Sequence, residues 1–465
     1  MTIEFIEVAY LLASASFILG LKFLSSPTTA TKGMLLSQGG MFLAVVATLF
    51  HHEVIDYKFI LGGIALGSII GALLATKIEM TAMPQMVALL NGFGGLSSAF
   101  VGGAAFYQLT PNISGISMGT IGVTVLIGTV TLTGSAVAFL KLQDLISGAP
   151  VVFPFQNIIN LLVFFVSLGI VAYLVLAPSN QMMFLVLVGI SLLLGIMVVI
   201  PIGGADMPVV ISLLNSYSGL AAAASGFILS NNVLIVSGAL VGSAGIILSQ
   251  LMCKAMNRSL GNVLFGVFGQ GDAPQEAAVA APPQEGDREV PKVLSGTPEE
   301  AAEIFKKAKS VIIVPGYGMA VAQAQHAVKD LAAILEKQGT SVKYAVHPVA
   351  GRMPGHMNVL LAEANVPYEQ LIDMDDINDD FEDTDISLVI GANDVVNPGA
   401  ETDPNSPIAG MPILWAYKST QVMVLKRSMR PGFAGIDNEL FIRPNTMMIF
   451  GDAKGTILKI SEALK

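Results

Sequence analysis

The chain has 465 residues, of which 53% are hydrophobic and only 12% are charged, and this composition excludes an ordinary soluble globular protein. The first 265 residues carry equal numbers of acidic and basic side chains, so the net charge of −10 lies in the remainder, which argues against a nucleic-acid partner. A single cysteine, Cys253, excludes an intrachain disulfide.

Nine apolar segments within residues 1–265 are long enough to cross a bilayer. They run approximately from Glu7 to Phe23, Met34 to Phe50, Phe59 to Ala75, Met86 to Tyr107, Met118 to Leu140, Ile158 to Leu176, Met182 to Ile200, Val209 to Leu229 and Val233 to Met252. The first segment follows acidic residues, unlike the basic start of a signal peptide. We therefore expect residues 1–265 to form a transmembrane domain.

An odd number of spans places the two ends of this domain on opposite sides of the membrane. Most loop cations lie on the side that leads to the C-terminal domain: Lys22, Lys32, Lys77, Lys141, Lys254 and Arg258, against Lys58 on the other side. Because positively charged loops stay in the cytoplasm, we expect the C-terminal domain to be cytoplasmic.

Small residues recur inside the spans, as in Gly63, Gly67 and Gly71 and in residues 221–226, and they let helix backbones approach closely. Polar residues there are few, and each has two interpretations: a role in conduction, or an interhelical hydrogen bond that serves packing. The candidates are Asn91, Ser135 and Asn215. Asp206 begins the eighth span, where it either caps the helix or takes part in coupling.

Residues 266–296 are rich in Gly, Pro, Ala and Gln, which predicts a flexible linker. In residues 297–465, a helix at Pro298 to Lys309 precedes a buried strand at Val311 to Val314, which a glycine turn joins to a helical run from Ala320 to Lys337. The other strand candidates are Ser341 to Val346, Ile386 to Ile390, Ile413 to Ala416, Val422 to Leu425 and Met447 to Phe450. This pattern predicts an α/β doubly wound, Rossmann-like domain.

The glycine turn contains Gly316 and Gly318, and Val321 stands where the dinucleotide-binding pattern has a third glycine. Glycine at these positions allows backbone N–H groups to approach a pyrophosphate. The same residues also fit a plain strand, turn and helix.

The second strand ends Val346-His347-Pro348, without the acidic residue that usually holds the ribose of NAD, and this favours NADP. Lys426, Arg427 and Ser428 directly follow another strand, and two cations with a hydroxyl suit a phosphate monoester. The alternative for them is a solvated charged loop. Loops 349–355 and 391–394 also follow strands and belong to the expected ligand crevice.

The acidic run Asp373 to Asp380 lacks the oxygen and the glycine that a calcium loop needs at its fifth and sixth places, so a solvated loop or a helix start is expected there. His347 and His356 lack zinc-type spacing, and no Ser-His-Asp pattern is present. We expect no metal site.

Six segments together resemble the beta subunit of the proton-translocating NAD(P) transhydrogenase, over essentially the whole chain. They are residues 203–209, 316–325, 347–358, 391–398, 426–428 and 451–454. The resemblance implies that the C-terminal domain binds NADP(H) in a flipped orientation. The implied contacts are Tyr317, Val349, Ala350, Gly351, Arg352, Met353, Pro354, Gly391, Ala392, Asn393, Asp394, Val395, Lys426, Arg427, Ser428, Asp452 and Ala453, with the loop Met429 to Gly435, including Gly432 and Phe433, closing over the nucleotide.

The resemblance further implies an alpha subunit that binds NAD(H) and adds membrane helices, a dimer of alpha–beta units in the bacterial cytoplasmic membrane, and lipid contacts. Hydride would pass directly between the nucleotides, so no catalytic side chain is expected. Proton flow through the helices would drive the reaction by changing how tightly NADP(H) is held. Asp206 and Arg258, at the cytoplasmic helix ends, would couple the two processes.

Two residues depart from the family's pattern. Asn91 stands where some members have a protonatable histidine, and Phe433 stands where a tyrosine is common. A different hypothesis is a transporter or channel whose cytoplasmic dinucleotide domain only senses redox state. A transporter should show a charged residue at mid-membrane, a carbonyl filter or paired interrupted helices, and the sequence shows none of these.

Overall fold

The computed structural model describes residues 3–265 and 293–465, apart from residues 25, 51–56, 111, 144, 149, 354, 405, 407 and 433. The chain divides into two compact units, Met1–Ser249 and Gln250–Lys465. Most of the expected linker, residues 266–292, lies outside the described residues. At its end, Ser295 forms a β-bridge with Met448.

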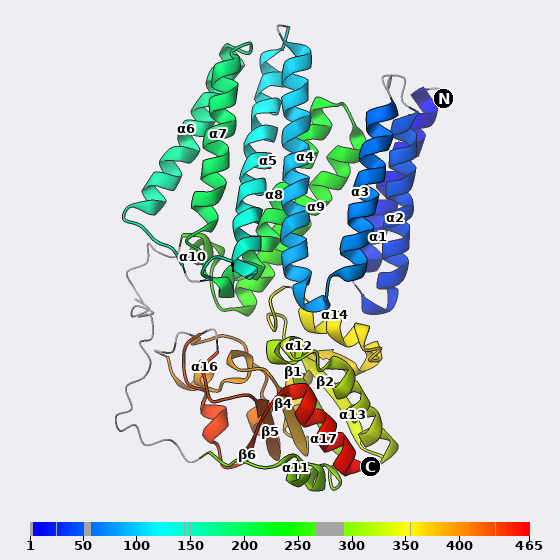
Figure 1. The fold of residues 1–465 in the computed structure, drawn as a ribbon, viewed down its shortest axis with the longest axis vertical. Coiled ribbons are helices and arrows are strands. Elements are labelled where there is room, and N and C mark those ends of the chain that lie inside the picture. The colour runs from blue at the N-terminus through cyan, green and yellow to red at the C-terminus, as the bar shows by residue number, and fades with distance from the viewer. Residues whose placement is uncertain are drawn as a thin grey trace. The chain divides into compact units, whose positions relative to one another are not determined.

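The first unit is built from long apolar helices, and nine in the described part of the chain are long and apolar enough to cross a membrane, as predicted. They are α1 (Ile3–Leu24), α2 (Pro27–Leu49), α3 (Tyr57–Lys77), α4 (Met83–Leu109), α5 (Gly115–Leu142), α6 (Gln156–Leu176), α7 (Gln181–Val199), α8 (Met207–Ile228) and α9 (Asn232–Ala255) (Figure 1). The division between the units falls inside α9, which is followed by the short α10 (Leu260–Phe265).

Small residues bring some of these helices into backbone contact. A Cβ atom added to Gly95 of α4 would lie 2.5 Å from the Gly128 carbonyl oxygen of α5, and one on Gly219 of α8 would lie 2.5 Å from the Gly242 nitrogen of α9. The glycine pattern of α3 behaves differently, because Gly63, Gly67 and Gly71 have no neighbouring atom within 4 Å among the described residues. The expected close packing at these three glycines is therefore not made among the described residues.

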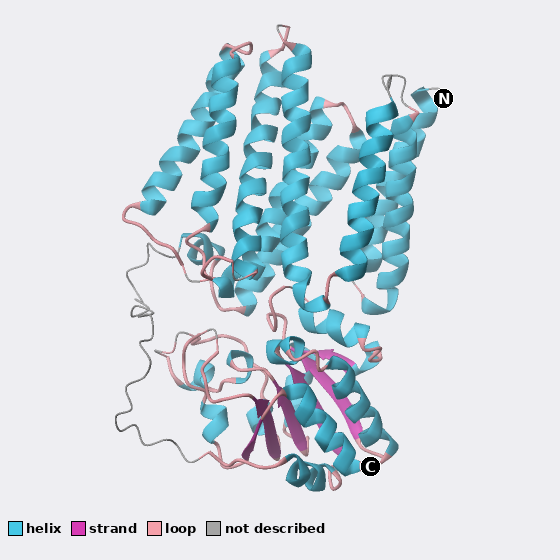
Figure 2. Ribbon diagram, viewed as in Figure 1, coloured by secondary structure: helices cyan, strands magenta, loops and turns pink. Residues whose placement is uncertain are grey.

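The second unit contains a six-stranded parallel sheet with the order β3-β2-β1-β4-β5-β6 (Figure 2). The strands are β1 (Ser310–Pro315), β2 (Ser341–Val346), β3 (Leu371–Asp373), β4 (Ile386–Ile390), β5 (Gln421–Lys426) and β6 (Thr446–Phe450). The central strands β1 and β4 are buried almost throughout, as expected for a parallel sheet that is covered on both faces. This confirms the predicted doubly wound architecture.

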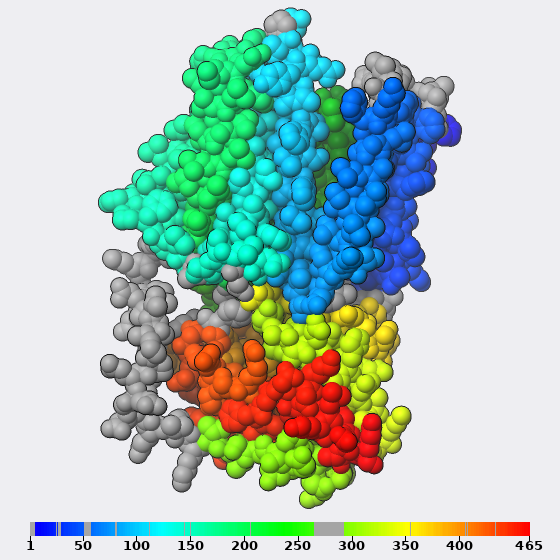
Figure 3. Space-filling model, viewed as in Figure 1, coloured from blue at the N-terminus to red at the C-terminus, as the bar shows by residue number. Residues whose placement is uncertain are grey.

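Five α-helices lie between strands: α12 (Tyr317–Val321), α13 (Gln325–Lys337), α14 (His356–Glu363), α15 (Met374–Ile377) and α16 (Gly399–Thr402). The helix α11 (Pro298–Phe305) precedes β1, and α17 (Ala453–Leu464) follows β6. The helices α17 (red) and α13 (yellow-green) lie at the surface in the space-filling view (Figure 3), and the ribbon shows them in front of the sheet (Figure 1). On the opposite face, Phe381, Leu414 and Phe441 join strand residues in one buried cluster.

Among the sequence predictions about this unit, one strand and one helix were wrong. Residues Ile413 to Ala416 form no strand, because their backbone groups bond to loops and side chains: Leu414 N–H donates to the Val395 carbonyl (2.9 Å) and Trp415 N–H to Asn378 Oδ1 (3.1 Å). The sixth strand is instead β3, whose three residues are too few for a hydropathy pattern. The acidic run does start a helix, since α15 begins at Met374 directly after Asp373.

The helical run from Ala320 to Lys337 is also not one helix. The chain leaves the helical conformation at Gln323, whose φ is 48°, and this residue separates α12 from α13. The turn after β1 is therefore followed by a short helix that begins at Tyr317 itself.

Candidate nucleotide site

The predicted site residues lie at one edge of the sheet. The loops that contain them leave the carboxyl ends of β1, β2, β4, β5 and β6, and because all strands are parallel these ends meet along the same edge. The strand order reverses between β1 and β4, where open α/β sheets form their ligand crevice.

Gly316 and Gly318 serve the packing of two loops against each other. A Cβ atom on Gly316 would lie 2.4 Å from the Ala392 backbone, and one on Gly318 would lie 2.7 Å from the Gly391 Cα atom. Their N–H groups are already bonded, Gly316 to the Ile390 carbonyl and Gly318 to the Gly391 carbonyl, both at 2.9 Å. Packing of the two loops is thus enough to require glycine at both positions. Because their N–H groups already donate to carbonyls of β4 and its loop, they are not available to bind an anion.

Tyr317 forms a stack with the loop after β2. The Arg352 guanidinium carbon lies 4.6 Å from the centroid of the Tyr317 ring, a cation–π distance, and the His356 ring centre lies 6.1 Å from it. The Arg352 N–H donates to His356 Nδ1 at 3.0 Å, so this histidine orients the loop that carries the arginine. Gly351 has φ of +111°, and a Cβ there would overlap the His356 ring at 2.6 Å.

His347 fixes the start of the same loop. Its Nδ1 accepts from the Val349 N–H (3.2 Å), and its Nε2 is 2.9 Å from the Pro412 carbonyl oxygen, so the neutral ring donates through Nε2. Burial lowers the pKa of His347 to about 4, and burial together with the charge of Arg352 lowers the pKa of His356 to about 4. Ala350 and Met353 are buried within this loop, while Pro354 lies outside the described residues.

Asp394 and Asn393, after β4, hold the loop that follows β5. Asp394 Oδ2 accepts from the Ala434 N–H at 3.0 Å, and a Cβ on Gly432 would lie 2.5 Å from Asp394 Oδ1. With the Asn393 amide oriented so that its oxygen faces donors, that oxygen accepts from the Gly432 N–H (2.7 Å) and from Lys426 Nζ (3.1 Å). The expected lid segment thus lies against the β4 loop, although Phe433 itself is outside the described residues.

The three residues after β5 differ in exposure. Lys426 is half-buried: its ammonium group donates to the Arg430 carbonyl and lies 4.8 Å from the centre of the Phe441 ring. Burial lowers the pKa of Lys426 from its usual value, against the opposing effect of Asp394 and Asp437. Arg427 and Ser428 are exposed, as is Met429, whereas the Lys426 ammonium group is held by the Arg430 carbonyl.

The remaining predicted contacts have clear structural surroundings. Asp452 caps α17, since its Oδ2 accepts from the Gly455 N–H at 3.0 Å, and Ala453 is buried in the first turn of that helix. Ala392 and Val395 are buried beneath the β4 loop, whereas Val321 is 46% exposed at the end of α12. Sequence reasoning missed Asn438, whose side chain donates to the Asn393 carbonyl at 3.0 Å; it follows no strand, and nothing in its sequence context indicated a role.

In the helical unit, the structure brings Asn91 and Ser135 to the contact between α4, α5 and α8. Asn91 is buried and donates to the Ile211 carbonyl of α8 at 3.1 Å. A Cβ on the adjacent Gly92 would lie 3.2 Å from Ser135 Cβ, and the hydroxyl of Ser135 is buried without a hydrogen-bond partner in the described part of the chain. Asn215, one turn after Ile211 on α8, is half-buried.

Asp206 occupies the N-cap position of α8, but its side chain makes no capping hydrogen bond, so the capping interpretation of this residue was wrong. Arg258 belongs to the second unit. It is exposed just after α9, and its N–H donates to the Cys253 carbonyl at 2.9 Å.

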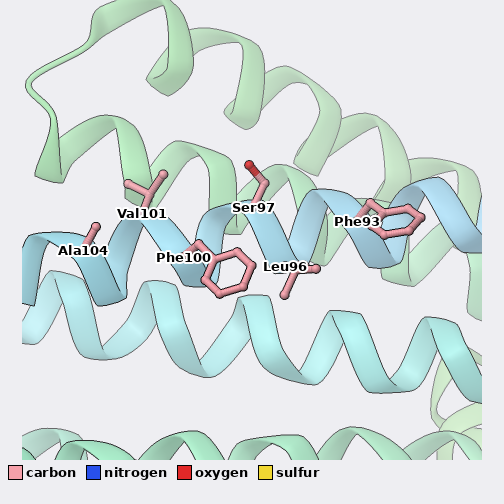
Figure 4. A pocket seen from close by; sticks show the side chains of 6 residues that line it. All are labelled: Phe93, Leu96, Ser97, Phe100, Val101 and Ala104. Carbon is pink, nitrogen blue, oxygen red and sulfur yellow. The ribbon is translucent and has the colours of Figure 1, made fainter. Parts of the chain in front are cut away.

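A surface hollow along α4 has a different character. Figure 4 shows its lining, which consists of Phe93, Leu96, Ser97, Phe100, Val101 and Ala104. Phe93 and Phe100 expose 54% and 68% of their surface. With one hydroxyl among apolar side chains, this hollow suits hydrocarbon and lacks the polar groups that orient a nucleotide.

Comparison with known proteins agrees with these features. The sequence profile of the NAD(P) transhydrogenase beta subunit matches residues 6–463. The chain is 48% identical over 473 aligned residues to the NAD(P) transhydrogenase subunit beta of Rhodospirillum rubrum, and the alignment covers 100% of both chains. The same identity and coverage are found for the protein of that name from Rhodospirillum rubrum strain ATCC 11170. Such similarity implies a multi-pass membrane protein, a nicotinamide dinucleotide ligand and an alpha subunit as partner, and the chain belongs to the NAD(P) transhydrogenase beta subunit family.

Proposed function

We propose that this subunit binds NADP(H) at the carboxyl edge of its sheet and exchanges hydride with NAD(H) held by the alpha subunit. The exchange is coupled to proton movement through the helical unit. The observation that carries the choice of NADP is the exposed pair Arg427 and Ser428 beside the half-buried Lys426 at the end of β5. At the end of β2, where NAD-selective folds place an acid, stands the buried neutral His347.

The nucleotide lies across the loops after β1, β2, β4 and β5 in this proposal. Arg427 and Lys426 pair with the 2′-phosphate, and Ser428 donates to it. Tyr317 and Arg352 bound the site on the β2 side, where their stacked arrangement offers an aromatic face and a cation. The lid, residues 429–435, closes over the ligand. Asp394 and Asn393 already hold the lid against the β4 loop through Ala434 and Gly432.

Arg427→Ala tests the assignment. Removing one charge-assisted hydrogen bond should weaken NADPH binding by about ten- to a hundredfold and leave the weak binding of NADH unchanged. The measurement is a titration of the purified full chain in detergent with each nucleotide. Lys454, which is also basic and close in sequence to Asp452, supplies the matched control as Lys454→Ala. NADPH affinity that is unchanged in Arg427→Ala rejects the assignment.

The family membership favours a transhydrogenase over the transporter alternative, and it supports the division of labour between subunits that we propose. NAD(H) binds to the alpha subunit, which also adds membrane helices, and hydride moves directly from C4 of NADH to C4 of NADP⁺. We further propose that two alpha–beta units associate as a dimer, that the helices sit in lipid of the bacterial cytoplasmic membrane, and that the second unit faces the cytoplasm. Of the six loop cations on that side, Lys141 is buried and is left out of the argument. The other five, Lys22, Lys32, Lys77, Lys254 and Arg258, support the orientation.

Asn91, Ser135 and Asn215 line the proton path in this proposal. The support is the position of Asn91 and Ser135 where α4, α5 and α8 meet, and the place of Asn215 one turn after Ile211 on α8. The buried Ser135 hydroxyl, which has no hydrogen-bond partner among the described residues, offers a place for water. Ser135→Leu and Asn215→Leu should each reduce proton uptake and coupled hydride transfer in vesicles that contain the alpha–beta complex. They should leave NADPH binding intact. An unaltered rate and proton-to-hydride ratio in both variants would make these residues packing residues.

Asp206 and Arg258 transmit the coupling in the same proposal. Asp206 stands at the start of α8 without capping it, and Arg258 is exposed where α9 ends. Asp206→Asn should suppress proton-coupled turnover in sealed vesicles without weakening NADPH binding. If coupled turnover persists at the original rate, Asp206 has no part in coupling.

A further inference from the structure

Lys141, in the last turn of α5, is a buried cation inside the helical unit. The sequence suggests a solvated loop charge, yet only 2% of this residue is exposed. Its ammonium group donates to the Ile200 carbonyl at 2.6 Å and to the Ile202 carbonyl at 2.8 Å. Burying an ammonium group is costly unless strong acceptors surround it, and carbonyls at a helix C-terminus carry the negative end of the helix dipole.

The two carbonyls belong to the connection between α7 and α8, residues 200–206. The connection is held at further points by the segment that follows α5: Gly204 N–H donates to the Gly148 carbonyl at 2.8 Å, and Val151 N–H donates to the Ile200 carbonyl at 3.4 Å. Of these four hydrogen bonds, the two made by Lys141 have a charged donor, and the other two join backbone groups. These hydrogen bonds fasten the connection to α5 and to the loop that follows it.

The helix α8 starts directly after this connection. α8 begins at Met207, and its N-cap residue Asp206 makes no capping hydrogen bond, so the first turn is not fixed by its own cap. Ile202 is four positions before Asp206, and Lys141 is six positions after Ser135 on α5. A single side chain thus links the helix that carries Ser135 to the segment that carries Asp206.

We propose that Lys141 is a positioning residue for coupling: its ammonium group fixes residues 200–206 against α5, and so holds Asp206 and the following turns of α8 in register with α5. The inference rests on the proposed coupling role of Asp206. It adds that the coupling segment is held by a buried charge from a neighbouring helix.

Gln156 provides a matched control. It is also 2% exposed, and its amide donates to the Met197 carbonyl in the last turn of α7 at 3.3 Å. It therefore contacts the same helix end, with a neutral donor, but does not reach residues 200–206. Gln156→Leu removes a buried polar contact to α7, and Lys141→Met removes the link to the connection.

The experiment uses the complete alpha–beta complex in sealed vesicles. Lys141→Met should lower coupled hydride transfer about tenfold or more, the loss expected when charge-assisted hydrogen bonds are removed, and should lower the proton-to-hydride ratio. NADPH affinity should stay unchanged. Hydrogen–deuterium exchange should rise in residues 200–207 of Lys141→Met and stay at the wild-type level there in Gln156→Leu. Lys141→Gln, which retains a neutral donor, should be intermediate and serves if Lys141→Met does not fold.

A Lys141 variant, Met or Gln, that is folded and shows the exchange pattern and proton-to-hydride ratio of Gln156→Leu overturns the inference. Failure of the proposed function gives a different result: the wild-type complex takes up no protons, or Asp206→Asn stays fully coupled. In that case faster exchange of residues 200–207 still supports the fastening by Lys141, and the absence of faster exchange rejects it.

Discussion

The two units use glycine to bring backbones together, but they impose different demands on it. In the helical unit, Gly95 and Gly128 lie within α-helices, and only the size of a side chain matters, since each Cβ would meet the other's carbonyl oxygen at 2.5 or 2.6 Å. In the sheet unit, Gly391 has φ of +64° and its Cβ would lie 2.3 Å from the Gly318 Cα atom. There both size and backbone conformation require glycine.

The units also satisfy buried polar groups differently. Hydroxyls in the helices commonly donate to the carbonyl four residues earlier in the same helix, as Ser167 does to Val163 (2.8 Å). In the sheet unit, His347, Asn393 and Asp394 bond to loops remote in sequence. The first arrangement leaves the surroundings of a helix free to change, whereas the second ties loops into one arrangement at the ligand edge.

Gly391→Ala should produce the largest effect, because it combines overlap with backbone atoms and an unfavourable φ. We expect it to lower the free energy of unfolding of the sheet unit by about 3 kcal/mol. Chemical denaturation of the full chain, followed by the fluorescence of Trp415, measures this. Gly339→Ala is the control: its φ is +91°, but a Cβ there meets no atom within 4 Å. If both variants lose the same free energy of unfolding, the backbone conformation alone accounts for the effect, and the contact between Gly391 and Gly318 contributes nothing.

The pH dependence of His347 tests whether the ligand-edge loops act as one unit. Its pKa is lowered from 6.5 to about 4, so the unfolded state binds the proton more readily. The stabilisation is fully present above about pH 6.5 and is lost as the pH falls towards 4, a change of about 3 kcal/mol. Denaturation at a series of pH values measures it. In His347→Gln, the free energy of unfolding should fall less steeply between pH 6.5 and 4, because the contribution of this residue is lost. An equally steep fall in the variant would contradict the assigned pKa.

Gly95→Ala should have the smallest of the three effects, because only size is at issue in the helices. Separating α4 from α5 at this point should cost about 2 kcal/mol. Gly103→Ala, on the same helix with no atom within 4 Å of its Cβ, should be neutral or stabilising because alanine favours helix. Thermal unfolding in detergent compares the two. If both variants unfold at the same temperature, backbone contact between α4 and α5 contributes little.

Much of the architecture could be predicted from sequence because it depends on hydropathy alone. The nine apolar segments became the helices α1 to α9, and five of the six strands were located at their apolar runs. The candidate site followed from the same strands, since residues directly after parallel strands must share an edge. The strand predicted at Ile413 to Ala416 was wrong because an apolar run indicates only burial. Burial does not distinguish a strand from an irregular segment that packs in the core.

The sequence by itself therefore determined which segments are apolar enough to cross the membrane, which form most of the sheet, and which loops stand at its carboxyl edge, because hydropathy is a local property of each segment. Only the tertiary structure decided what individual residues contact. It showed that Gly316 and Gly318 admit a neighbouring loop, that Gly63, Gly67 and Gly71 pack against nothing in the described chain, and that Lys141 is buried on carbonyls of the next connection. Such contacts join positions remote in sequence, and their geometry arises only when helices and strands have assembled.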